Sequence, residues 1–137
     1  CPVLLLRDNN VEQIRPSGMG LGLDYTINFK NRLVETEIDL VENDLLVLYT
    51  DGITESKNSE MDDFGEQLFE EILLENRNEE VDNISNKVIR EITVFSKNNP
   101  QHDDITLVIL KWKKQLINTT PDETPGLNIM ENKNVRI

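Results

Sequence analysis

The chain has 137 residues, of which 37% are hydrophobic, enough for one domain with a modest core. Its 26 acidic residues outnumber 14 basic ones, and the formal charge of -12 disfavours nucleic acids and anionic membranes as partners. Cys1 is the only cysteine, which excludes an intrachain disulfide. Because no apolar run approaches the roughly 20 residues of a membrane span, we expect a cytoplasmic protein without direct membrane contact.

The first 40 residues carry the alternation of β-structure. The stretch VLLLRDNNVEQI has two short apolar runs around Asp8-Asn9-Asn10, which predicts a β-hairpin. Residues 25–30 and 34–40 alternate strictly between apolar and polar side chains, which predicts two strands with one wet face. The opening residues, without an initiating methionine, read as the middle of a sheet, so we expect the chain to be a piece of a longer protein.

Two later stretches, 45–50 and 105–112, lack alternation and predict central strands covered on both faces. Two amphipathic helices fit between them. The first follows Asp63 and Glu66, which have the spacing of a capping box, and the second runs from about 81 to 95, with Asn78 as its cap. After Lys114 the periodicity fails, so residues 114–137 are expected to form a flexible polar tail.

Acidic residues stand at the ends of both predicted central strands. Asp51-Gly52 follows the first and is also a favoured hairpin pair, but no second strand follows at once. Asp103-Asp104 precedes the second strand, and two adjacent carboxylates repel one another unless a cation lies between them. Hard cations such as Mg²⁺ and Mn²⁺ prefer such oxygen ligands. A solvated turn at Asp103-Asp104 is the alternative.

These motifs together carry a resemblance to a known family. The stretches LYTDGITES, FGEQLFEEIL and HDDITLVIL, in this order, resemble the C-terminal half of the PPM (type 2C) metal-dependent protein phosphatases, in the SpoIIE-like bacterial branch. PVLLLRDNNVEQIRPSGMGLGL upstream resembles the same branch, and the likeness covers about residues 1–113. It implies an α+β fold with α-β-β-α layers, mostly antiparallel strands and two helices.

The resemblance also implies a metal site with two Mn²⁺ or Mg²⁺ ions in the complete domain, whose bridging water attacks phosphoserine or phosphothreonine. It places this site at Asp51, Gly52, Asp103 and Asp104, with Asp51 and Asp103 as ligands. Thr54 and Thr106 are at most supporting hydroxyls. The family's N-terminal acidic Gly motif has no match here, so we expect residues 1–113 to form an incomplete, inactive and poorly stable half of the domain.

Some residues near the acids have competing interpretations. His102 is a candidate general acid, against the alternative of a solvated turn histidine. Trp112 is expected to pack rather than to recognise a ligand. The connection 55–63 either contacts a partner near the metal site or is a solvated charged loop.

The resemblance implies a serine/threonine phosphatase that acts on a small phosphoprotein such as an anti-sigma factor antagonist, under an N-terminal sensor that is missing here. A homodimer is left open. The alternatives are a degenerate, inactive PPM-like module that binds a protein partner and an acidic cation-binding domain of unrelated fold. The sequence upstream of Cys1 would separate the first two, because an intact acidic Gly motif there favours the enzyme.

Overall fold

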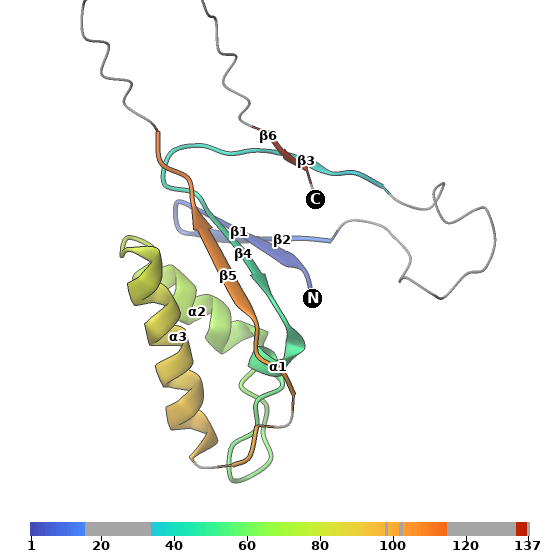
Figure 1. The fold of residues 1–137 in the computed structure, drawn as a ribbon, viewed down its shortest axis with the longest axis vertical. Helices are drawn as coiled ribbons and strands as arrows, with labels where there is room; N and C mark the ends of the chain where they lie inside the picture. Colours follow the sequence, from blue (N-terminus) through green and yellow to red (C-terminus); the bar gives the residue numbers. More distant parts are fainter. Residues whose placement is uncertain (16–33, 98, 102, 115–133, 137) are drawn as a thin grey trace, which may run out of the picture.

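A four-stranded antiparallel sheet with helices on one side organises the chain (Figure 1). The computed structural model describes residues 1–15, 34–97, 99–101, 103–114 and 134–136. The strands are β1 Val3–Arg7, β2 Asn10–Ile14, β3 Glu37–Asp39, β4 Leu45–Tyr49, β5 Leu107–Lys111 and β6 Asn134–Arg136. The helices are α1 Asp51–Thr54, α2 Glu66–Asn76 and α3 Val81–Ser96. This α+β architecture is the one the sequence predicts.

The hairpin at the start of the chain is confirmed. Strands β1 and β2 pair antiparallel, with Arg7 opposite Asn10, so that Asp8 and Asn9 form the turn between them. Asp8 has a φ of 51°, and aspartate is one of the few residues other than glycine that adopt this left-handed region readily.

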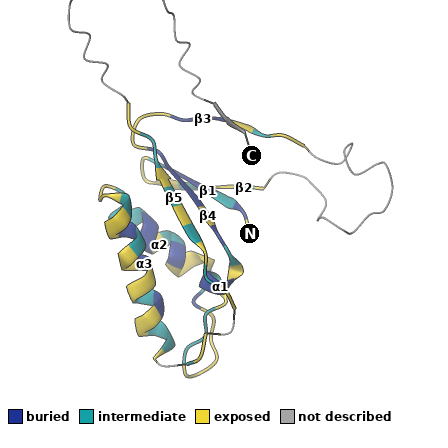
Figure 2. Cartoon of the chain, in the orientation of Figure 1, coloured by how far each residue is buried: buried dark blue, intermediate teal, exposed yellow. Residues whose placement is uncertain are grey.

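Strand order in the main sheet is β2-β1-β4-β5, so β4 is flanked on both sides. Side chains alternate between the two faces of a strand, and β1 and β4 have buried side chains on both faces. One face packs against α2 and α3, with Phe69, Ile84 and Val88 among the fully buried helix residues (Figure 2). The strand residues on that face are Leu4, Leu6, Leu45, Val47 and Tyr49.

The opposite face of the sheet carries a second, smaller core. Leu5 and Leu46 pack there with Ile38 and Leu40, which come from β3 and its flank. Trp112 packs against this cluster, as expected. Strand β3 pairs antiparallel with β6, so residues 134–136, which fall within the predicted polar tail, form a strand in the structure.

The prediction that residues 105–112 form a central strand is wrong. Among the described strands, β5 lies at the end of the sheet order and pairs only with β4. Its inward residues pack under α3, but Val108 and Leu110 are 44% and 52% exposed on the other face. Leu48, which is opposite Val108 on β4, is 37% exposed. These three apolar side chains are exposed to solvent on one face of the sheet. We call them the open face of the sheet.

Both helices exist where their apolar stripes predict them, but their starts differ from the prediction. Helix α2 begins at Glu66 after Gly65, with no side-chain cap, so the capping box at Asp63 does not form. Asp63 instead pairs with Lys57, its carboxylate 2.6 Å from the ammonium group. Helix α3 follows Glu80 rather than Asn78, again without a side-chain cap.

An ion pair between a buried aspartate and a partly exposed arginine fixes the turn that leads into β4. The Asp44 side chain is 2% exposed and accepts hydrogen bonds from Arg7 Nε at 3.1 Å and Arg7 Nη2 at 2.6 Å. The main-chain N–H of Val41 donates to the same carboxylate at 2.8 Å. The carboxylate raises the pKa of Arg7, chiefly through the hydrogen bond. This bidentate geometry ties β1 to the start of β4.

Two sequence predictions lie outside the described residues: the strand at 25–30 and the candidate general acid His102. None of the helices in the described ranges is long and apolar enough to cross a membrane.

Candidate metal site

The Asp51-Gly52 pair begins a helical turn. Strand β4 ends at Tyr49, Thr50 is extended with φ -101° and ψ 158°, and α1 starts directly at Asp51. A two-residue hairpin would require the chain to reverse into a neighbouring strand, which it does not do here. The hairpin interpretation of Asp51-Gly52 is therefore excluded, and the exposed Asp51 side chain lies at the end of a rigid, buried strand.

Thr50 joins the two acidic segments. Its hydroxyl donates to the main-chain oxygen of Asp104 at 2.7 Å and accepts from the N–H of Thr106 at 2.9 Å. Its own N–H donates to the main-chain oxygen of Thr106 at 3.1 Å. These bonds hold residues 104–106 against the end of β4, although the two segments are far apart in sequence.

Gly52 makes the close contact between the segments possible. A Cβ atom at this position would lie 2.5 Å from the main-chain oxygen of Asp104 and 3.3 Å from that of Asp103. The first distance is shorter than a carbon-oxygen contact allows, so a larger residue would push the segments apart. Ser56 strengthens the turn by donating its hydroxyl to the Gly52 oxygen at 2.7 Å.

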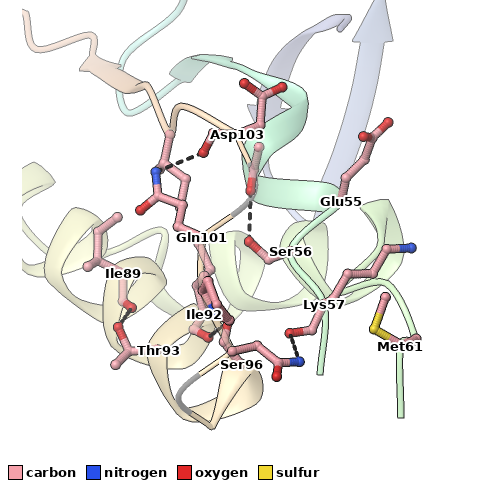
Figure 3. Close-up of a pocket in the computed structure, with 14 residues that line it drawn as sticks. Glu55, Ser56, Lys57, Met61, Ile89, Ile92, Thr93, Ser96, Gln101 and Asp103 are labelled. Atoms are coloured by element: carbon pink, nitrogen blue, oxygen red, sulfur yellow. Dashed lines mark hydrogen bonds between the residues drawn. The ribbon is translucent and has the colours of Figure 1, made fainter. Parts of the chain in front are cut away.

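The Asp103 side chain is exposed and only partly engaged. One carboxylate oxygen accepts the N–H of Asp104 at 2.7 Å, and the Asp103 main-chain oxygen accepts from Gln101 Nε2 at 2.7 Å. In Figure 3 the carboxylates of Asp103 and Glu55 both point away from α3. The carboxylate of Asp103 is thus oriented by its own turn and has a second oxygen available for a cation.

The structure brings the two predicted acidic segments, 51–52 and 103–104, together at one end of the sheet. Their carboxylate and carbonyl oxygens are the donor type that hard divalent cations prefer. Within the described ranges, however, no group of three or more His, Cys, Asp or Glu side chains is placed to hold a metal ion. The donors fit the chemistry of Mg²⁺ or Mn²⁺ without making a complete site, and the ligand roles of these residues stay a prediction.

The two supporting threonines differ in their surroundings. The Thr54 hydroxyl donates to the Asp51 main-chain oxygen at 3.3 Å, within the α1 turn. Thr106 is held by its main chain, through Thr50. Sequence reasoning missed Thr50 itself. A hydroxyl residue between a buried strand and an Asp-Gly pair was the available signal.

A pocket of about 600 Å³ opens beside the acidic segments (Figure 3). It lies between the second half of α3, the connection after α1 and the segment that leads to β5. Its lining is Gly52, Glu55, Ser56, Lys57, Met61, Ile89, Ile92, Thr93, Ser96, Asn99, Pro100, Gln101, Asp103 and Ile105. The connection 55–63 is anchored at residues 57 and 63, which form a β-bridge, and Asn99 Nδ2 donates to the Lys57 oxygen at 3.4 Å. Residues 59–63 are exposed, as the solvated-loop alternative expects.

Solved structures with a similar fold include bacterial phosphatase domains. The SiaA PP2C domain of Pseudomonas aeruginosa matches with a TM-score of 0.69 and 16% identity, over 82% of this chain and 43% of that domain. The phosphatase domain of SpoIIE from Bacillus subtilis, presoaked with Mn, matches with a TM-score of 0.58 and 16% identity, over 93% of this chain and 50% of that one. A crystal form of the same domain without domain swapping matches with a TM-score of 0.57 and 16% identity, over 90% of this chain and 51% of that one.

At this identity the structures establish the fold, and the chain spans about half of each domain. No curated protein sequence matches the chain. The family assignment comes from a sequence model, Stage II sporulation protein E (SpoIIE), which matches residues 1–113. The chain therefore belongs to the SpoIIE family of PPM phosphatases.

Proposed function

We propose that this chain supplies one half of the catalytic domain of a divalent-metal-dependent serine/threonine protein phosphatase. The observation that carries the proposal is the contact between the Asp51-Gly52 turn and the Asp103-Asp104 segment, held by Thr50. Two carboxylates from distant parts of the chain are thereby presented at one end of a sheet, Asp51 at the start of α1 and Asp103 in a bend that leads to β5.

Asp51 and Asp103 are the proposed ligands, because both side chains are exposed and each belongs to one of the two joined segments. A bound divalent ion would activate a water and neutralise charge on the phosphoryl oxygens. The chain's own residues fix the geometry. Thr50 sets the position of the 104–106 main chain, Gly52 allows the segments to approach, and the turn at Asp103 orients its carboxylate.

The remaining ligands and the covering layer belong, in this proposal, to the other half of the domain. Support comes from the open face of the sheet, where Leu48, Val108 and Leu110 are 37%, 44% and 52% exposed. Adjacent apolar side chains on a sheet are stabilised when another layer removes them from water. The half-length match to the related domains agrees with this interpretation. We therefore propose that the chain is inactive alone.

The proposed substrate is a phosphoserine or phosphothreonine in a small regulatory protein, such as an anti-sigma factor antagonist. This part rests on the family resemblance, as do the N-terminal sensor and a bacterial cytoplasmic setting. The chain's net charge of -12 also disfavours strongly acidic partners and nucleic acid.

The test measures hydrolysis of p-nitrophenyl phosphate in Mn²⁺ by this chain alone and after mixing with the N-terminal half of a SpoIIE-type domain. We expect turnover only in the mixture. Asp51→Asn and Asp103→Asn should each abolish it, whereas Asp82→Asn, an exposed acid in the first turn of α3, should not. Turnover by the chain alone would refute the half-site proposal.

Metal binding is tested separately from catalysis. Mn²⁺ broadens NMR signals of nearby nuclei, so titration should selectively broaden the amide signals of residues 51–54 and 103–106. If the broadening is unchanged in the Asp51→Asn and Asp103→Asn variants, the ligand assignment is wrong. A mixture that binds a partner protein but neither metal nor phosphate ester would instead favour the non-catalytic binding module.

A further inference from the structure

The pocket next to the candidate metal site extends beyond the residues proposed to hold the metal. It shares Gly52 and Asp103 with that site, and extends from there along α3. Its volume of about 600 Å³ falls within the size range of ligand pockets, so it accommodates a large side chain and adjoining main chain. One wall is a loop closed by a β-bridge between residues 57 and 63 and by the Lys57–Asp63 ion pair at 2.6 Å.

The hydroxyl groups on the α3 wall are already used. Thr93 Oγ1 donates to the Ile89 main-chain oxygen at 2.8 Å, and Ser96 Oγ donates to that of Ile92 at 2.8 Å. These bonds turn both hydroxyl protons into the helix. The α3 wall therefore offers few donors to a guest and presents mainly carbon atoms.

Donor groups of the uncharged polar side chains on the other walls are engaged as well. Ser56 Oγ and Gln101 Nε2 each donate to a main-chain oxygen at 2.7 Å, and Asn99 Nδ2 donates to the Lys57 oxygen at 3.4 Å. The Lys57 ammonium group is paired with Asp63. A guest that needs hydrogen-bond donors from these walls would have to break such bonds, whereas an apolar guest would not.

Apolar side chains remain available to a guest. Ile89 is 44% exposed and Met61 is 62% exposed, and both line the pocket. Burying apolar surface of this kind is favourable, and methionine adapts readily to the shape of a bound side chain. The pocket therefore selects a large aliphatic or aromatic side chain.

We infer that this pocket receives a large apolar side chain of the phosphoprotein substrate, located two or three residues from the phosphorylated residue. This inference rests on the proposed function, since it places the phosphate at Asp51 and Asp103. The two sites share Gly52 and Asp103, so the spacer is short, and an extended chain of two or three residues covers about 7–11 Å. The exposed carboxylates of Glu55 and Asp103 at the mouth favour neutral or basic residues beside the apolar one.

The test uses two phosphoserine heptapeptides, Ala-Leu-Ala-Ser(P)-Ala-Leu-Ala and its counterpart with alanine in place of both leucines. Binding to the complete chain is followed by NMR in Mg²⁺. We expect the leucine peptide to bind about tenfold more tightly or better and to shift the methyl signals of Ile89 and Met61. The unphosphorylated leucine peptide should shift the same signals.

Ile89→Asp should remove the preference for leucine. The matched control is Val94→Asp, because Val94 is also an exposed apolar residue of α3, at 58%, but does not line the pocket. Both positions are exposed, so both variants should fold, which thermal unfolding checks. Equal affinity for the two peptides, or equal loss in the two variants, would overturn the inference.

The outcomes also separate this inference from the proposed function. If reconstituted halves hydrolyse phosphate esters but show no preference for leucine, only the pocket inference fails. If the leucine preference persists in a protein without metal-dependent hydrolysis, the proposed function fails and apolar docking is supported.

Discussion

Replacing Gly52 by alanine tests the contact on which the candidate metal site depends. The added Cβ would lie 2.5 Å from the main-chain oxygen of Asp104 and 3.0 Å from its carbonyl carbon. These are main-chain atoms, and Thr50 holds them through a 2.7 Å hydrogen bond, so they cannot move aside as a flexible side chain would. Overpacking at a tight contact costs about 1–3 kcal/mol of unfolding free energy, and we expect a loss of about 2 kcal/mol for Gly52→Ala.

Gly65→Ala provides the matched control. Gly65 has a φ of 82°, and an added Cβ would meet nothing within 4 Å. With a ψ of 157°, Gly65 lies in a region that is essentially restricted to glycine, so alanine there costs about 1–3 kcal/mol through backbone strain alone. The two variants should therefore lose comparable stability in urea denaturation. Only Gly52→Ala should also shift the amide signals of residues 103–106. In the reconstituted phosphatase, a displacement of about 1 Å at the site should lower kcat about 100-fold.

Either of two results would refute a tight contact between Gly52 and the segment 103–104. Gly52→Ala could leave the unfolding free energy and the amide signals of residues 103–106 unchanged, in which case the two segments do not meet as described. Alternatively, Gly65→Ala could shift those signals as strongly as Gly52→Ala, and the effect would then be general loosening rather than crowding.

The remaining predictions concern the supports of the site and the core. Thr50→Val removes two hydrogen bonds from a partly exposed hydroxyl and should cost about 1 kcal/mol in urea denaturation, with Thr50→Ser close to the parent. Arg7→Ala should lower the unfolding free energy by about 3 kcal/mol, because it leaves the 2%-exposed Asp44 carboxylate without its cation. Asp44→Ala should lower it by about 2 kcal/mol. A larger loss in Asp44→Ala than in Arg7→Ala would contradict this. Burial, helped by nearby carboxylates, raises the pKa of Tyr49 above 10.0, so the folded state holds the phenol proton more tightly than the unfolded state. The unfolding free energy should therefore be retained below pH 10 and fall as the pH rises above 10. Tyr49→Phe should reduce this fall, which urea denaturation at several pH values would measure.

Much of the fold could be predicted because its signals are local. The hairpin follows from turn residues between two apolar runs, and the helices follow from their apolar stripes. The meeting of segments 51–52 and 103–104 could be anticipated only through the family resemblance, because the sequence alone does not say that the two adjoining strands pair.

The errors have a common cause, which is competition between partners that a sequence does not rank. Asp63 has the spacing of a helix cap but pairs with Lys57 instead. The run 105–112 predicts burial on both faces, yet β5 is covered only on the helix side. Thr50 gives no periodic signal at all, because its importance lies in two bonds to a segment distant in the chain.

In the proposed function, the other half of the domain covers the open face of the sheet and also supplies the remaining metal ligands. Leu48 and Val108 are opposite one another on β4 and β5, and Asp51 follows Leu48 by three residues, about 10 Å along an extended strand. A layer that covers these apolar side chains would therefore end close to the carboxylates of the candidate site. In the proposed function, the contacts that stabilise the sheet and the groups that complete the metal site then come from one source, so assembly of the two halves and activity should rise together.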